Sequence, residues 1–217
     1  MLFEPSFAKL GDRNGQSGSD RIWTLRVAEG SWIMSAAERE IRDTLLAARV
    51  LQEDNSFNRN VIYTDPALIR TISINLAGRL MDNQIDVVVG PGTYGAILAV
   101  FVAADLSLLN RRKVRSAIVT KVGGTFEWQR GHGELVANQN VAVVADETVT
   151  GDTLRDVIRV VQSAQGKATA AAVICNCGDV TAEMIGAPLF SLVSLDLESH
   201  AESDCPLCRA PTPVNVW

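Results

Sequence analysis

The stretch V-A-V-V-A-D-E-T-V-T-G-D-T, from Val141 to Thr153, decides the fold of this chain. Its first five residues are apolar and small or β-branched, which favours a strand buried on both faces. Beyond it, apolar residues recur at helical spacing, at Leu154, Val157, Ile158 and Val161. A strand that passes through a short polar loop into a helix predicts one unit of a parallel α/β sheet.

The loop between this strand and this helix has the chemistry of a phosphate and sugar site. Such loops hold anions in α/β proteins, because free backbone N–H groups and the helix dipole converge there. Thr150 and Thr153 offer hydroxyl donors, and Gly151 lets the backbone come close. The carboxylate of Asp146 would repel a phosphate and suits sugar hydroxyls or a cation better. The loop predicts a phosphate beside a ribose; an ordinary strand–turn–helix with a threonine cap is the alternative.

The segment resembles the motif of type I phosphoribosyltransferases that binds phosphoribosyl diphosphate (PRPP). That motif has four apolar residues, two acids, two apolar residues and then T-T-G-x-S/T. With the motif aligned on Thr150-Gly151, Asp146 matches the second acid and Thr153 the final hydroxyl. Four positions depart from it, namely Ala145, Glu147, Thr148 and Val149. The resemblance implies a PRPP site made of Asp146, Glu147, Thr148, Val149, Thr150, Gly151, Asp152 and Thr153.

A second strand, turn and helix precede this unit. The strand pattern Asp86-Val87-Val88-Val89 leads through G-P-G-T-Y-G, residues 90–95, into a helix expected from Ala96 to Leu109. A glycine-rich turn that opens a helix is again an anion-site geometry. By its order and distance from the PRPP motif, the turn resembles the pyrophosphate loop of the same family. The resemblance implies that Gly90, Pro91, Gly92 and Thr93 hold the diphosphate.

A long segment follows the third expected strand, residues 114–121. About 18 residues separate it from the strand at Val141, and loops of that length are usually lids or disordered. In orotate phosphoribosyltransferases a mobile catalytic loop ending in K-x-H-G lies here, and Arg130-Gly131-His132-Gly133 matches it, with Phe126 and Glu127 in place of a basic pair. The resemblance implies catalytic roles for Lys121, Arg130, His132 and Asp146; a solvated hairpin is the alternative.

Residues 56–68, S-F-N-R-N-V-I-Y-T-D-P-A-L, resemble the stretch of the orotate branch that helps to hold the base. Tyr63 and Asp65 occupy the matching positions and are the candidate base-binding residues. The lysine that the family carries just before this stretch is absent from Asp54-Asn55-Ser56, and Arg59 could supply a cation for a carboxylated base. Tyr63 as an ordinary core residue is the alternative.

Composition limits the remaining possibilities. The chain has 217 residues, a hydrophobic content of 47% and a formal charge of −5, with no large basic block, so nucleic acid is not expected as a main partner. No apolar run reaches the ~18 residues of a membrane span, and the N-terminus lacks the pattern of a signal peptide. We expect a cytoplasmic protein with reduced cysteines.

Further elements complete one α/β domain over residues 1–217, with a parallel sheet flanked by helices. We expect a core at about 67–188 and a small hood formed by about 1–66 and 189–217. A strand is expected at 23–27, helices at about 35–52 and 67–81, strands at 167–177 and 189–197, and a short helical turn at 180–185.

Four cysteines form a C-x-C and a C-x-x-C pair, and these are Cys175, Cys177, Cys205 and Cys208. Formally they are four thiol ligands for zinc. The first pair lies on an expected strand, where small buried thiols are common. We therefore expect no stoichiometric protein-bound metal.

Taken together, the motifs resemble a type I phosphoribosyltransferase of the orotate branch. The resemblance implies transfer of a phosphoribosyl group from PRPP to a nucleobase such as orotate, with Mg²⁺ on the diphosphate and a homodimeric enzyme. A non-catalytic protein that senses PRPP or a nucleotide is the competing interpretation, and the sequence does not name the base.

Overall fold

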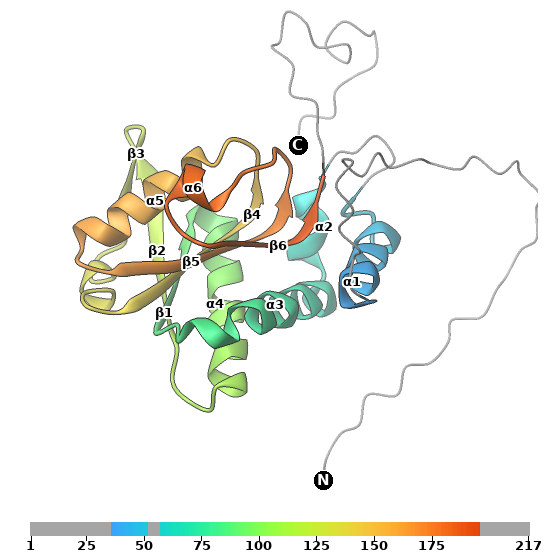
Figure 1. The fold of residues 1–217 in the computed structure, drawn as a ribbon, viewed down its shortest axis with the longest axis horizontal. Helices are drawn as coiled ribbons and strands as arrows, with labels where there is room; N and C mark the ends of the chain where they lie inside the picture. Colours follow the sequence, from blue (N-terminus) through green and yellow to red (C-terminus); the bar gives the residue numbers. More distant parts are fainter. Residues whose placement is uncertain (1–35, 52–56, 196–217) are drawn as a thin grey trace, which may run out of the picture. The chain divides into compact units, whose positions relative to one another are not determined.

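The computed structural model describes residues 36–51 and 57–195 (Figure 1). Its helices are α1 (Ala36–Ala47), α2 (Arg59–Thr64), α3 (Pro66–Leu80), α4 (Gly92–Leu109), α5 (Asp152–Ser163) and α6 (Ala182–Ile185), with 3₁₀ turns η1 (Met81–Asn83) and η2 (Gly133–Leu135). Its strands are β1 (Val87–Pro91), β2 (Arg115–Val122), β3 (Thr125–Trp128), β4 (Asn140–Thr148), β5 (Lys167–Asn176) and β6 (Leu189–Ser194). The strand expected at 23–27 and the cysteines Cys205 and Cys208 lie outside the described residues.

The six strands form one sheet in the order β3-β2-β1-β4-β5-β6. All neighbouring pairs are parallel except β2 with β3. From β1 the chain proceeds through α4 to β2 on one side, and from β4 through α5 to β5 on the other. The strand order therefore reverses between β1 and β4, and ligands of open α/β sheets bind beyond the carboxyl ends of strands at such a point. The expected parallel sheet flanked by helices is confirmed.

Each face of the sheet has its own apolar core, because successive side chains of a strand point to opposite faces. Val88, Ala142 and Val144 pack with α1, α3 and α4 on one face. Val87 and Val143 pack with α5 and α6 on the other. Figure 1 shows α3 and α4 on the side of the sheet away from α5 and α6. Burial on both faces explains why these strands lack polar alternation.

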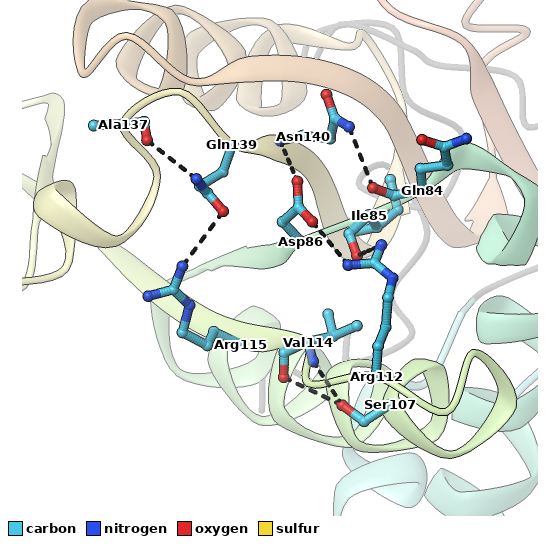
Figure 2. A network of polar contacts seen from close by, with 10 residues as sticks. All are labelled: Gln84, Ile85, Asp86, Ser107, Arg112, Val114, Arg115, Ala137, Gln139 and Asn140. Atoms are coloured by element: carbon cyan, nitrogen blue, oxygen red, sulfur yellow. Dashed lines mark hydrogen bonds and ion pairs between the residues drawn. The ribbon is translucent and has the colours of Figure 1, made fainter.

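A polar network fastens the amino ends of the central strands (Figure 2). Asp86 accepts from the backbone N–H of Asn140 at 2.9 Å and from the Arg112 guanidinium at 2.8 Å. Arg112 also donates to the carbonyl of Ile85 at 2.5 Å, and Arg115 donates to Gln139 at 3.4 Å. The network joins the segments before β1, β2 and β4 at the end of the sheet opposite their carboxyl ends, so it fixes their register without taking part in the site.

Several element boundaries differ from expectation for local reasons. The helix expected to reach about residue 52 ends at Ala47, and Arg49 then adopts a left-handed backbone with φ of 58°. The helix α4 begins at Gly92 instead of Ala96, so most of the glycine-rich turn is its first turn. The long segment after β2 contains β3, which pairs antiparallel with β2, so this part of the segment is a hairpin, the alternative that the sequence left open beside a lid.

The 18-residue α4 is the single described helix long and apolar enough to span a bilayer by length and composition. Its Leu98, Val102 and Leu106 are fully buried in the core against the sheet. The helix also carries Asp105, whose buried carboxylate accepts from the Ser73 hydroxyl at 2.6 Å and pairs with Arg70 at 2.5 Å. A helix that buries one face in a protein core and holds an ion pair to α3 is a core helix.

Candidate functional site

A pocket of about 500 Å³ lies at the carboxyl ends of β1, β2 and β4, where the strand order reverses. Residues 91–95 and 145–153 line it, together with Arg59, Lys121 and Phe126. Three segments that the sequence analysis singled out separately therefore meet at one place. They are the glycine-rich turn, the central acidic loop and the residue that ends the third strand.

The wall formed by the first turn of α4 offers free backbone donors. Pro91 precedes the helix and no side chain caps its first N–H groups, so these donors are available to an anion. The turn needs glycine at two positions. A Cβ on Gly90 would lie 1.8 Å from the carbonyl oxygen of Gly95, and a Cβ on Gly95 would lie 2.7 Å from Pro91. The sequence G-P-G-T-Y-G thus folds into a tight cradle because glycine alone permits it.

The opposite wall is the loop before α5. Gly151 takes a left-handed backbone with φ of 79°, and no side chain at this position caps the helix. Thr150 donates to the carboxylate of Asp152 at 2.8 Å, and Arg155 pairs with the same carboxylate. The Thr150 hydrogen bond, aided by Arg155, lowers the pKa of Asp152. The charge of Asp152 is thus partly neutralised within its own helix turn, and the dipoles of α4 and α5 both point positive ends toward the pocket.

Two neighbouring carboxylates form the floor between these walls. Asp146 accepts the backbone N–H of Glu147 through Oδ1 at 2.9 Å. Its other oxygen, Oδ2, is buried without a hydrogen-bond partner in the described part of the chain and lies 3.5 Å from the guanidinium of Arg59. Glu147 is hydrogen-bonded directly by Arg59. Burial raises the pKa of Glu147, and the positive charge of Arg59 opposes that rise.

The short helix α2 carries Arg59 to the pocket and is held by aromatic contacts. Tyr63 stacks on Tyr94 of α4 with ring centroids 4.5 Å apart and planes 22° apart, and the Tyr94 hydroxyl bonds the side chain of Asn60 at 3.0 Å. The Tyr63 hydroxyl is buried and has no partner among the described residues. Burial, and then the nearby charge of Asp146, raise the pKa of Tyr63, so this hydroxyl stays a donor.

The two candidate base-binding residues have different surroundings. Tyr63 lies against both the core and Tyr94, beside the pocket. Asp65 caps α3, since its Oδ1 accepts the backbone N–H groups of Ala67 at 2.9 Å and Leu68 at 3.2 Å. An N-cap aspartate followed by proline is a helix-start pattern, so a structural account of Asp65 is complete without a ligand.

The four candidate catalytic residues do not all meet. Lys121 lines the pocket with Asp146, and its ammonium group lies 5.8 Å from the centre of the Phe126 ring. Arg130 instead lines a more open hollow of about 520 Å³ beside Trp128 and the end of α5. His132 accepts the backbone N–H of Ile118 at 2.9 Å through Nδ1, which ties the segment after β3 to β2. In this conformation the segment is a hairpin, and Arg130 and His132 lie apart from the pocket.

The described residues hold no group of three or more histidine, cysteine or acidic side chains that could enclose a metal ion. Magnesium does not need such a cage, because it is usually bound by one or two carboxylates together with substrate phosphates. The buried Oδ2 of Asp146, which accepts no hydrogen bond from the described residues, fits that role. Cys175 and Cys177 are fully buried with sulfurs 2.8 Å apart, and their contact and burial raise the pKa of Cys175.

Two residues of the pocket and one contact within it were not predicted from the sequence. Tyr94 and Phe126 line the pocket, and Glu147 meets Arg59 there. A signal existed for Tyr94, since it stands inside the glycine-rich turn. Arg59 and Glu147 lie 88 residues apart in the chain, and no local pattern predicts their contact. The one indirect signal was the absence of the family's lysine, which suggested Arg59 as a substitute cation.

Comparison with known proteins agrees with this geometry. No protein-family model matches the chain. An orotate phosphoribosyltransferase of Thermoanaerobacter sp. (strain X514) is 31% identical over 155 residues, which cover 70% of this chain and 76% of that protein. The chain belongs to the type I phosphoribosyltransferase family.

Two further similarities extend over more of this type I phosphoribosyltransferase. An orotate phosphoribosyltransferase of Caldicellulosiruptor bescii is 29% identical over 191 residues, 88% of this chain and 90% of the relative. The crystal structure of Mycobacterium tuberculosis H37Rv orotate phosphoribosyltransferase in complex with 5-phospho-α-D-ribosyl 1-diphosphate superimposes with a TM-score of 0.57 at 20% identity, over 75% of this chain and 92% of that one. The family expected from the sequence is thus confirmed.

Proposed function

We propose that this phosphoribosyltransferase transfers the 5-phosphoribosyl group of PRPP to a ring nitrogen of orotate or a similar heterocycle. The observation that supports this most is the convergence on a single pocket of two helix N-termini whose N-cap residues, Pro91 and Gly151, make no side-chain cap hydrogen bond, and of Asp146, whose Oδ2 accepts no hydrogen bond from the described residues. The two helix N-termini can each bind an anion, and the Asp146 carboxylate between them can accept hydrogen bonds from hydroxyl groups. This arrangement matches a molecule that carries phosphate at both ends of a ribose.

In the proposed reaction the base nitrogen attacks C1 of the ribose, the bond from C1 to the diphosphate oxygen breaks, and pyrophosphate leaves with the bonding electrons. The proton of the attacking nitrogen passes to water. Residues 90–93 and the first turn of α4 would hold the diphosphate, and residues 150–153 the 5′-phosphate. Asp146 would hold ribose hydroxyls, and Lys121 would neutralise the leaving group. Magnesium, when bound, adds positive charge to the diphosphate, with Asp146 as the available protein ligand.

A protein that binds PRPP or a nucleotide without turnover is the second candidate. The position of Arg130 and His132, outside the pocket, favours it. The enzyme requires the hairpin after β2 to close over the site and exclude water. We expect this segment to close over the pocket, as the resemblance to orotate phosphoribosyltransferases implies. We also expect a homodimer, and a cytoplasmic location.

Release of pyrophosphate separates the two candidates. The protein is incubated with PRPP, Mg²⁺ and a panel of pyrimidine and purine bases, and pyrophosphate is detected enzymatically. We expect release with at least one base, and a loss of about 100-fold or more in Arg130→Ala with PRPP affinity kept. Tight PRPP binding without release for any base would establish the binding protein instead.

A further inference from the structure

Arg59 and Glu147 form a pair that joins two distant parts of the pocket. Arg59 is the first residue of α2, and Glu147 stands in the central loop, at a position where the PRPP motif has an apolar residue. The guanidinium bonds the Glu147 carboxylate directly and lies 3.5 Å from Asp146 Oδ2, which is ion-pair distance without a hydrogen bond. Glu147 therefore holds the guanidinium by a hydrogen bond, whereas Asp146 Oδ2 accepts no hydrogen bond from the described residues.

The pair leaves part of the guanidinium available to a ligand. The Arg59 side chain is 42% exposed, whereas that of Glu147 is 22% exposed. A guanidinium has five N–H donors and no acceptor. Within the described part of the chain, the Arg59 guanidinium donates one hydrogen bond, to Glu147. The remaining donors border the pocket, so the group that meets them must accept hydrogen bonds and is favoured if it is negative.

The other ligand groups already have partners elsewhere in the pocket. Phosphates suit the N-termini of α4 and α5 and the ammonium of Lys121, and ribose hydroxyls suit Asp146. The wall next to Arg59 is aromatic, formed by Tyr94 of α4 stacked on Tyr63 of α2. A flat heterocycle is the part of the substrate that gains from an aromatic wall. The acceptor group beside Arg59 therefore belongs to the base.

We propose that Arg59, held in place by Glu147, is the residue that selects an acceptor base carrying an anionic substituent. The proposal rests on the proposed function and explains two features together. Glu147 departs from the motif because it positions Arg59, and the orotate-branch lysine is dispensable because Arg59 provides the cation from α2. Arg59 is a specificity-determining residue, and Glu147 is a positioning residue that acts through it.

Equilibrium binding of two nucleotides tests the proposal without relying on turnover. Orotidine 5′-monophosphate and uridine 5′-monophosphate differ only by the carboxylate on the base, so their Kd ratio isolates its contribution. Calorimetry is performed on the parent protein and on Arg59→Gln, Arg59→Lys and Glu147→Gln. Arg159→Gln, which makes the same change in an exposed ion pair on α5, is the matched control. Thermal unfolding of each variant verifies that it is folded.

We expect the parent and Arg159→Gln to bind the carboxylated nucleotide at least about 10-fold more tightly. Arg59→Gln should reduce that ratio to within about 2-fold, because it weakens binding of the carboxylated nucleotide more than binding of uridine 5′-monophosphate, and Arg59→Lys should keep part of the ratio. Glu147→Gln should reduce the Kd ratio partly. The double variant Arg59→Gln/Glu147→Gln should have the same Kd ratio as Arg59→Gln, because both substitutions act through one contact.

Three results would overturn the proposal. The first is equal affinity of the parent for both nucleotides, and the second is an equal loss of affinity for both nucleotides in Arg59→Gln. The third is tighter binding of both nucleotides by Arg59→Gln, which would show that Arg59 only occupies the ribose site. The pyrophosphate assay keeps the two claims apart. An Arg59-dependent Kd ratio without any pyrophosphate release contradicts the enzyme but not the selection, whereas release with neutral bases and no Kd ratio contradicts the selection alone.

Discussion

Replacing Asp146 by asparagine removes one charge and one acceptor from the floor of the pocket, and with them the 3.5 Å ion pair to Arg59. Asparagine keeps the oxygen that accepts the Glu147 backbone N–H at 2.9 Å, and this bond fixes the orientation of the new amide. The amide nitrogen then replaces Oδ2, the buried atom that has no hydrogen-bond partner within the described residues. A ribose hydroxyl that donates to Oδ2 in the parent would meet another donor in Asp146→Asn.

Two effects of opposite sign set the magnitude. A hydrogen bond to a charged group contributes about 1.5–3 kcal/mol, and its loss weakens PRPP binding. Loss of the carboxylate also removes repulsion of phosphate, about 0.5 kcal/mol for one unneutralised charge at roughly 7 Å in water. The hydrogen bond dominates, with a net loss of about 1–2.5 kcal/mol, or a rise in the PRPP Kd of about 5-fold to 70-fold.

Isothermal titration with PRPP and Mg²⁺ measures the effect. Asp156→Asn is the matched control, because it makes the same change in an ion pair 3.3 Å long on the exposed face of α5, and its Kd should stay within about 2-fold of the parent. Equal Kd values for Asp146→Asn and the parent, with both proteins folded, would refute the assignment of Asp146 to the ribose.

Four other outcomes follow from the structure. Burial raises the pKa of Glu147 in the folded state, so above that pKa the ionised carboxylate destabilises the folded protein. Glu147→Gln should therefore raise Tm near pH 7, and the gain should vanish below the ordinary glutamate pKa of about 4.3. A gain in Tm that is constant at every pH would contradict this. Asp86→Ala removes the hydrogen bonds from Arg112 and Asn140 and should lower the free energy of unfolding in urea by about 2–3 kcal/mol. An unchanged urea midpoint would contradict a stabilising role for the polar network of Figure 2. A homodimer should sediment at micromolar concentration, and Val100→Glu, on the exposed apolar face of α4, should shift it toward monomer if that face is buried between copies; a fully active parent monomer would exclude the dimer. Elemental analysis after dialysis should find no stoichiometric zinc, and one zinc per chain would contradict the expectation for the cysteines.

The parts of the fold that depend on local patterns were predictable from the sequence. The apolar run before Asp146 and the helical spacing after Leu154 identify β4 and α5, because a strand buried on both faces and an amphipathic helix leave different periodicities. The parallel order followed from repetition of this unit. Loop positions at strand ends then followed, since parallel strands bring their carboxyl ends to one edge of the sheet.

The parts that depend on contacts between distant residues were not predictable. The strand β3 is not one of these parts, because it follows β2 after the two-residue turn Gly123-Gly124, both with positive φ, which is a local hairpin signal. Arg59 and Glu147 come together because α2 docks on α4 through Tyr63 and Tyr94, a contact that no periodicity encodes. The N-cap role of Asp65 was also readable locally, because the residue stands directly before a proline, and its assignment to the base stays a prediction.

Phosphorus NMR of PRPP incubated with Mg²⁺, orotate and the protein tests the central claim most directly, because substrate, pyrophosphate and nucleotide monophosphate give separate signals. The account predicts that the PRPP signals decline while pyrophosphate and a nucleotide monophosphate appear in equal amounts, and that omission of the base stops both. PRPP that remains intact with orotate and every other base, or that yields pyrophosphate with ribose 5-phosphate and no nucleotide, would contradict it.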